Sequence, residues 1–433
     1  MTDLNQLDAS TIATRVTAGA LSVTDVAESL IARVDARDPE VRAWAWFDRD
    51  LLRDRARLLD AVPVKGPLHG VPIGVKDVIA TYDMPTAHNT ARYRNSRTGI
   101  DAACVDTLRA AGALIAGKTV TTEFAATLRG GMTRNPRALA HTPGGSSSGS
   151  AAAVADWQAA LGLGTQTGGS TIRPASFCGV YGWKPTWSSI SREGLKMSST
   201  TLDTLGLYAR SARDLMLLAD VFAIEAPETP APTSLGGLKI GICRTPHWGK
   251  ALPATAQAMT QAIALLRKAG AEVSELVLPG IFDTIGESHR IVARTEGRAA
   301  FINEYRNTPD LHDDFKATVE NRSGITPGDA RAAYRHADHC RGVYDDIASQ
   351  YDIVLTPSAT GEAPEGHDIT GDASFNSMWT LLQVPVVNVP GLVGPAGLPV
   401  GLSLVARRYE DRKALAVAEL VGALFGQYEA VAA

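Results

Sequence analysis

Two glycine- and serine-rich tracts, separated by a short apolar segment, constrain this chain more than any other feature. The first tract is Gly144-Gly-Ser-Ser-Ser-Gly-Ser150, and the second is Gly162-Leu-Gly-Thr-Gln-Thr-Gly-Gly-Ser170. Between them, Ala151-Ala-Ala-Val-Ala155 favours a helix. One such tract alone is typical of a flexible linker, but linkers do not normally come in pairs across an apolar helix. The pair therefore predicts two fixed loops in a folded core.

The second tract has the composition of an oxyanion-binding loop. Its backbone N–H groups at Thr167, Gly168, Gly169 and Ser170 can converge, because the glycines carry no Cβ to obstruct them. Such a loop suits an oxyanion that forms when Ser170 attacks a carbonyl. Phosphate-binding patterns do not fit, since no Gly-Lys-Ser/Thr follows and Thr167 stands where the dinucleotide pattern requires glycine.

A serine nucleophile needs a base, and the sequence offers more than one candidate. His69 and His141 lie near the motifs, but no carboxylate spacing marks either as the base of a triad. Lys76 ends the apolar segment 68–77, LHGVPIGVKD. From this segment alone, Lys76 is either a buried base or a surface lysine whose stem lies along apolar side chains.

Apolar runs alternate with helical patterns along the chain and predict an α/β fold with a large, mainly parallel or mixed sheet. Capped helices are predicted after Ser22 and Ser211, because each serine precedes an aspartate three residues later and then a helical apolar spacing. Residues 226–234, APETPAPTS, are predicted to be a surface loop. Strands are predicted at Val71–Val75, Ala113–Ala116, Lys239–Cys243, Glu272–Leu278 and Asp352–Leu355.

Charge and composition exclude several classes of function. Lys+Arg of 42 against Asp+Glu of 46 gives a net charge of −4 without a long basic run, which argues against nucleic acid as the main partner. Residues 381–406 carry no charge, but prolines and glycines recur through them, so they predict two buried strands and no membrane span. The polar N-terminus and four widely spaced cysteines favour a cytoplasmic protein.

Three segments together resemble the amidase signature family of serine hydrolases. Residues 69–77, HGVPIGVKD, are similar to its lysine motif, and residues 144–155, GGSSSGSAAAVA, to its Ser/Gly core. Residues 164–186, GTQTGGSTIRPASFCGVYGWKPT, resemble the segment that bears its nucleophile. The resemblance implies a mixed sheet covered by helices on both faces. It also implies a single domain over 1–433, with a catalytic core at about 60–215 and a more variable, pocket-forming half at about 235–433.

By position, the resemblance makes Ser170 the nucleophile, Ser146 a bridging serine that follows a cis peptide bond, and Lys76 the general base. The implied reaction is hydrolysis of a small amide through an acyl-enzyme, with residues 167–170 holding the oxyanion. Lys76 must be uncharged to accept a proton, which burial favours. No metal or organic cofactor is implied. Esters and carbamates stay open as substrates, and a homodimer is expected by analogy.

Two departures from the commonest family pattern bear on the substrate. Gln166 stands where many members have aspartate, and Arg173 lies three residues after the nucleophile where the usual spacing is two. This version resembles the branch that includes malonamidase, so Arg173 either reads a substrate carboxylate or ties loops together. Met132 and Trp379 are further candidate substrate contacts. The alternative function is that of an amidotransferase subunit which releases ammonia from glutamine within a complex.

One cluster of metal-ligand types lies outside these motifs. His336, His339 and Cys340 share a predicted helix, but they supply an incomplete ligand set, so a solvated helix face is the better interpretation.

Overall fold

Eleven strands form one mixed sheet in the computed structural model, which describes residues 4–225 and 231–432. The order across the sheet is β1-β3-β2-β4-β6-β5-β10-β11-β9-β7-β8. The strands are β1 (Trp44–Trp46), β2 (Pro72–Lys76), β3 (Leu114–Thr119), β4 (Leu161–Gln166), β5 (Tyr181–Lys184), β6 (Thr204–Ala209), β7 (Lys239–Ile242), β8 (Glu272–Glu275), β9 (Ile353–Pro357), β10 (Val386–Val389) and β11 (Leu402–Val405).

Parallel pairing is confined to two parts of the sheet. Strand β2 runs parallel to β3 and β4, and β7 runs parallel to β8 and β9. The other neighbouring pairs are antiparallel. The predicted α/β fold with a mixed sheet is therefore confirmed.

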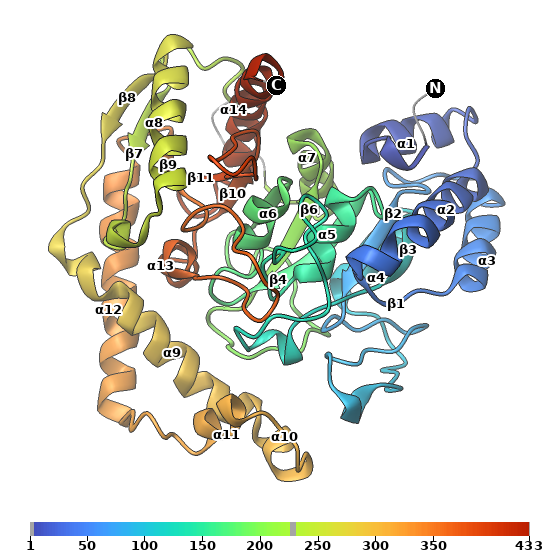
Figure 1. The fold of residues 1–433 in the computed structure, drawn as a ribbon, viewed down its shortest axis with the longest axis horizontal. Coiled ribbons are helices and arrows are strands. Elements are labelled where there is room, and N and C mark those ends of the chain that lie inside the picture. Colours follow the sequence, from blue (N-terminus) through green and yellow to red (C-terminus); the bar gives the residue numbers. More distant parts are fainter. Residues whose placement is uncertain (1–3, 226–230, 433) are drawn as a thin grey trace.

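Helices pack around this sheet (Figure 1). They are α1 (Ala9–Thr17), α2 (Val23–Val41), α3 (Arg49–Asp60), α4 (Ala103–Ala110), α5 (Ser148–Ala155), α6 (Ile172–Cys178), α7 (Ala212–Val221), α8 (Pro253–Lys268), α9 (Ile285–Ala300), α10 (Ile302–Asn307), α11 (Asp313–Val319), α12 (Pro327–Ala348), α13 (Ser374–Leu381) and α14 (Asp411–Ala432). Short 3₁₀ turns are η1 (Leu4–Gln6), η2 (Ala91–Tyr93), η3 (Glu123–Ala125), η4 (Trp248–Lys250) and η5 (Gly280–Thr284).

Local sequence signals place several of these elements, but residues 162–166 of the second glycine-rich tract, predicted as a loop, belong to β4, and residues 148–150 of the first belong to α5. Ser22 caps α2 and Ser211 caps α7, each side chain accepting from the backbone N–H three residues later. The five predicted strands correspond to β2, β3, β7, β8 and β9, although β8 ends three residues earlier than predicted. Segment 381–406 forms β10 and β11, and in the described part of the chain no helix is both long and apolar enough to cross a bilayer. Of the predicted loop 226–234, residues 226–230 lie outside the described residues.

Missing side chains let helix α6 approach the centre of the sheet closely. A Cβ on Gly182 of β5 would lie 2.5 Å from the Cβ of Ala175 in α6. A Cβ on Gly206 of β6 would lie 2.0 Å from Oγ1 of Thr171. Because both glycines leave this space free, α6 lies close against β5 and β6. Helix α6 also contacts α5, and α5 in turn contacts β4.

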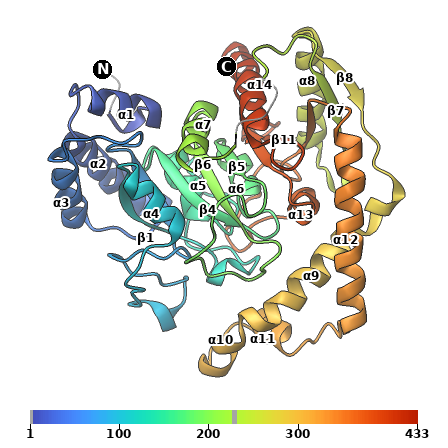
Figure 2. The ribbon, with the colours of Figure 1, turned by 180° about the vertical axis from the view of Figure 1, so that it is seen from behind.

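Helices α9, α10 and α11 extend away from the sheet as an arm, and α12 returns the chain along α9 (Figures 1 and 2). A small aromatic cluster connects the arm to the N-terminal half: Phe124 packs with Phe301, Leu311 and Phe315. The arm is therefore held against the N-terminal half of the chain.

Candidate active site

Lys76 lies at the end of β2 and is fully buried. Its Nζ is 2.8 Å from Ser146 Oγ, 2.9 Å from Ser147 Oγ and 2.7 Å from Thr165 Oγ1. Strand β2 is buried along its whole length, so the surface-lysine interpretation is excluded. The amine instead contacts three hydroxyls, one of which belongs to the predicted bridging serine.

Burial controls the charge of this amine. Desolvation lowers the pKa of Lys76 well below its ordinary value, and the more distant charge of Asp203 opposes the shift more weakly. Within the described residues, no carboxylate oxygen lies within 4.0 Å of Lys76 to form an ion pair. A lysine held among neutral hydroxyls in this way is able to accept a proton.

Ser146 is presented by the turn that leads into α5. The peptide bond between Gly145 and Ser146 is cis, as the resemblance implied. The Gly145 carbonyl accepts from Arg173 Nη2 at 2.6 Å, and the Ser146 carbonyl accepts from the N–H of Thr122 at 3.3 Å. Contacts on both sides of the cis bond thus fix the direction in which the Ser146 hydroxyl faces Lys76.

The loop at 167–170 is held by its carbonyl groups. Each of these four carbonyls accepts a hydrogen bond from a residue of another segment or from the following helix. The donors are His289 Nε2 for Thr167, Thr380 Oγ1 for Gly168, the N–H of Arg173 for Gly169 and Tyr208 Oη for Ser170, at 2.8, 2.9, 3.0 and 3.2 Å.

The opposite sides of the first three of these peptide groups are left free. A carbonyl and the N–H of the same planar peptide unit point in opposite directions. Among the described residues, the N–H groups of Gly168, Gly169 and Ser170 have no hydrogen-bond partner. They are therefore available to an oxygen in the adjoining cavity, as an oxyanion hole requires.

Gln166 and Asp203 stabilise this loop from behind. Gln166 Oε1 accepts from the N–H groups of Thr171 and Ile172, at 2.9 and 3.0 Å. Asp203 accepts from the Thr167 hydroxyl and, through its other oxygen, from the N–H of Ser198. Burial raises the pKa of Asp203, and the hydrogen bonds to its carboxylate oppose that shift. The loop is thus anchored at both of its ends.

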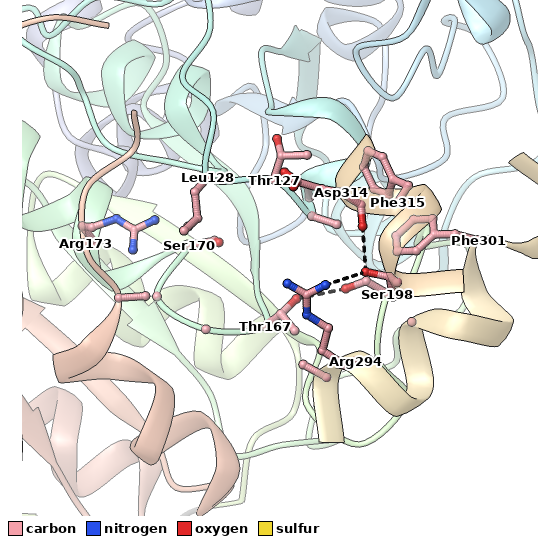
Figure 3. Close-up of a pocket in the computed structure, with 18 residues that line it drawn as sticks. Thr127, Leu128, Thr167, Ser170, Arg173, Ser198, Arg294, Phe301, Asp314 and Phe315 are labelled. Carbon is pink, nitrogen blue, oxygen red and sulfur yellow. Dashed lines mark hydrogen bonds between the residues drawn. The ribbon is translucent and has the colours of Figure 1, made fainter. Parts of the chain in front are cut away.

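A cavity of about 340 Å³ opens between this loop and the arm (Figure 3). Ser170 and the glycines beside it form one wall, and residues of α9 and α11 form the other. The lining residues are Ala125, Ala126, Thr127, Leu128, Thr167, Gly168, Gly169, Ser170, Arg173, Ser198, Ala293, Arg294, Gly297, Phe301, Asp314, Phe315, Thr318 and Ala373.

This geometry agrees with comparisons to known proteins. The Amidase family model matches residues 25–415. The chain belongs to the Amidase family. One subunit of the glutamyl-tRNA(Gln) amidotransferase of Roseiflexus castenholzii is 33% identical over 97% of this chain and 96% of its own length.

Two solved structures place the fold within the same family. A structure described as the crystal structure of amidase aligns with a TM-score of 0.86 and 28% identity, covering 96% of this chain and 99% of the other. The native peptide amidase from Stenotrophomonas maltophilia aligns with a TM-score of 0.79 and 27% identity, covering 96% of each chain. The expected amidase fold is therefore confirmed, and the finer resemblance to malonamidase stays a prediction.

In this member of the Amidase family, Arg173 contacts two loops and also lines the cavity, so its loop-tying role is observed and its reading of a substrate carboxylate stays a prediction. Its Nη2 ties loops together by donating to the Gly145 carbonyl and, at 3.1 Å, to Thr370 Oγ1. Its Nε and Nη1 are buried without a partner among the described residues, and the side chain lines the cavity. Burial lowers the pKa of Arg173 to about 10, so the guanidinium keeps its charge at neutral pH.

Two predicted contacts are absent from the lining of the cavity. Trp379 is fully buried in α13 and packs edge-to-face against Tyr344 in a separate part of the core. Met132 is 56% exposed. Neither residue contacts the space beside Ser170, so their roles in substrate binding stay predictions without support from the lining of this cavity.

The histidines considered from sequence are held by backbone carbonyls elsewhere. His69 contacts Leu59 O at 2.9 Å, and His141 contacts Ala363 O at 2.8 Å. On α12, His336 contacts Ile281 O at 2.8 Å, His339 is exposed and Cys340 is buried. Residues 4–225 and 231–432 contain no group of three or more His, Cys, Asp or Glu residues arranged to hold a metal ion.

Sequence reasoning missed His289, Asp203 and Thr380. His289 lies on α9, more than a hundred residues beyond the loop it contacts, and no motif surrounds it. Thr380 is the neighbour of Trp379 in α13, and its hydroxyl donates to the Gly168 carbonyl.

Proposed function

We propose that this protein cleaves the carbon–nitrogen bond of a small amide through Ser170, Ser146 and Lys76. The observation that carries the proposal is the 2.8 Å contact between Lys76 Nζ and Ser146 Oγ in a fully buried setting. Acyl transfer by a serine needs a base next to the hydroxyl and hydrogen-bond donors for the oxyanion. A lysine with a lowered pKa next to a serine hydroxyl supports the first role, and the nearby loop with free N–H groups supports the second.

The proposed reaction proceeds in two steps. Neutral Lys76 accepts the proton of Ser146, and Ser146 accepts the proton of Ser170 as Ser170 Oγ attacks the carbonyl carbon. The oxyanion is held by the N–H groups at 168–170, which the anchored carbonyls turn towards the cavity. Collapse breaks the carbon–nitrogen bond, and the proton returns through Ser146 to the leaving amine. Water then attacks acyl-Ser170 by the reverse relay.

The favoured substrate is glutamine, hydrolysed to supply ammonia within a complex of subunits. This choice rests on the curated relatives, which are glutamyl-tRNA(Gln) amidotransferase subunits with 29–33% identity over nearly the whole chain. It is better supported than a stand-alone amidase. One observation favours the second candidate, an acid amide hydrolysed without partners: Arg173 keeps two buried donors unpaired beside Ser170.

Labelling of Ser170 tests the proposed chemistry directly. A fluorophosphonate probe should modify the wild-type protein, and Ser170→Ala and Lys76→Ala should lose labelling while circular dichroism shows an intact fold. Ser189→Ala is the matched control, because Ser189 is a half-buried serine outside the cavity. Labelling that persists in Ser170→Ala would exclude this nucleophile.

A second assay separates the two substrates. Ammonia release from glutamine is measured with the protein alone and with amidotransferase partner subunits, and compared with release from malonamate and a neutral aryl amide. Turnover of glutamine only in the presence of partners supports the amidotransferase. Efficient turnover of malonamate by the isolated protein supports the stand-alone enzyme.

We further propose that residues 1–433 act as a single domain. A single sheet contains strands from both the core at about 60–215 and the half at about 235–433, and β10 pairs with β5 across them. A continuous sheet of this kind supports one cooperative folding unit.

A further inference from the structure

The cavity beside Ser170 carries two arginines on opposite sides of the nucleophile (Figure 3). Arg173 comes from α6, and Arg294 comes from α9 in the arm. Asp314 is the only acidic residue among the lining residues, and its side chain is 60% exposed with Oδ2 3.4 Å from His312 Nδ1. The lining side chains therefore include two positively charged groups and one negatively charged group.

Arg294 differs from the other arginines of its helix. Arg290 forms an ion pair with Glu287, and Arg298 is exposed. Arg294 is half-buried, and no carboxylate oxygen of the described residues lies within 4.0 Å of it. A half-buried guanidinium without an anionic partner favours an anion from outside the chain.

The guanidinium is also held in place. Arg294 Nη1 donates to Thr318 Oγ1 at 3.2 Å, and Thr318 Oγ1 donates to the carbonyl of Asp314 at 2.8 Å. This contact uses one of five guanidinium hydrogens and leaves the others for a ligand. Phe301 and Phe315 line the cavity on the same side, so an apolar chain can lie beside Arg294.

We propose that the cavity binds an amide with two anionic groups, one bound by Arg173 close to the scissile carbonyl and the other bound by Arg294 at the arm. This rests on the proposed function in the form of its second candidate, an acid amide hydrolysed without partners, because it assumes that the cavity holds the substrate of Ser170 and because glutamine carries only one carboxylate. A short hydrocarbon chain connects the two anionic groups along the apolar wall. The proposal makes Arg294 a residue that determines specificity.

Binding of aliphatic dicarboxylates tests this assignment. Calorimetry measures the dissociation constants of four- to eight-carbon α,ω-dicarboxylates and of monocarboxylates of equal length. In the wild type, at least one dicarboxylate should bind about 10-fold or more tightly than its monocarboxylate partner, as expected for a second charge-assisted hydrogen bond. Arg294→Gln should remove that difference, and Thr318→Val should reduce it.

Arg298→Gln is the matched control, because Arg298 is exposed one helical turn further along α9 and should leave binding unchanged. Protection of Ser170 from the fluorophosphonate by the same dicarboxylate places the bound anion in the cavity. Equal binding of the two classes of acid, a preference that survives Arg294→Gln, or no binding at millimolar concentration would overturn the proposal. Labelling of Ser170 without any acid present tests the proposed function separately.

Discussion

Replacement of Lys76 by methionine should change how the stability of the protein depends on pH. The wild-type amine is buried among hydroxyls, and its pKa is lowered well below 10.5 by desolvation. In the unfolded chain the same lysine titrates near its ordinary value of about 10.4. Between those two pKa values, the unfolded state therefore binds one more proton than the folded state.

The sign and size of the effect follow from this difference. The free energy of unfolding rises with pH wherever the unfolded state binds more protons, at about 1.4 kcal/mol per pH unit for one proton. As pH falls below about 10.4, Lys76 therefore lowers stability progressively, and the loss levels off below the folded pKa. Methionine carries no proton, so Lys76→Met should remove this slope while retaining most of the buried volume.

Urea unfolding of wild type and variant between pH 8.5 and 9.5 measures the difference. The wild-type free energy of unfolding should fall by about 1.4 kcal/mol more than that of the variant as pH decreases by one unit. Lys118 and Lys184 are also buried with lowered pKa values, about 8 and 7, but they are present in both proteins and their slopes cancel. Lys268→Met, at an exposed position on α8, controls for the loss of a lysine. Parallel curves for wild type and Lys76→Met would refute a neutral Lys76.

Three further perturbations test the loop and its support. Gln166→Met should lower the free energy of unfolding by about 2–6 kcal/mol, because two buried N–H groups lose their acceptor. Gln166→Glu keeps an acceptor, so its free energy of unfolding should fall by less in the same urea titration. His289→Ala should lower kcat about 10-fold or more with little change in KM, because the variant leaves the Thr167 carbonyl without its donor. His289→Gln should recover part of the rate. The control His336→Ala removes a similar contact on α12 and should change neither constant. Gly149→Ala should reduce the melting temperature or prevent folding, because its Cβ would lie 2.2 Å from Ala43 O and 2.3 Å from Val120 N. Gly131→Ala should be tolerated, because the atom nearest to its Cβ would be Val120 Cγ1 at 4.0 Å.

The parts that sequence predicted are those governed by local patterns. Capped helices after Ser22 and Ser211 were identified because capping depends on residues three apart, and seven of the strands were identified from short apolar runs, whereas β1, β4, β5 and β6 were not. The cis bond before Ser146 was implied only by family resemblance. By contrast, β5 pairs with β6 and β10, and no local pattern encodes which strands become neighbours in a mixed sheet.

The residues that support the candidate site were harder to predict for the same reason. His289 reaches Thr167 across 122 positions, and a single histidine on a helix has no spacing that marks it. Trp379 was predicted as a substrate contact from family resemblance, and it is buried in the core. Its neighbour Thr380 donates to the Gly168 carbonyl, since adjacent residues of a helix point about 100° apart. The direction of each side chain on α13, which sequence alone did not define, therefore determines which of its residues contacts the loop at 167–170.

Glutamine at position 166 connects these supports in a way that aspartate does not allow. Its Oε1 accepts from two N–H groups at the start of α6, and its Nε2 donates to Thr380 Oγ1 at 3.1 Å. Thr380 Oγ1 in turn donates to the Gly168 carbonyl. An ionised carboxylate has no hydrogen to donate, and aspartate is one methylene shorter, so aspartate would lose the link to α13. The departure from the commonest family pattern therefore adds a neutral connection from α6 to the loop that faces the cavity.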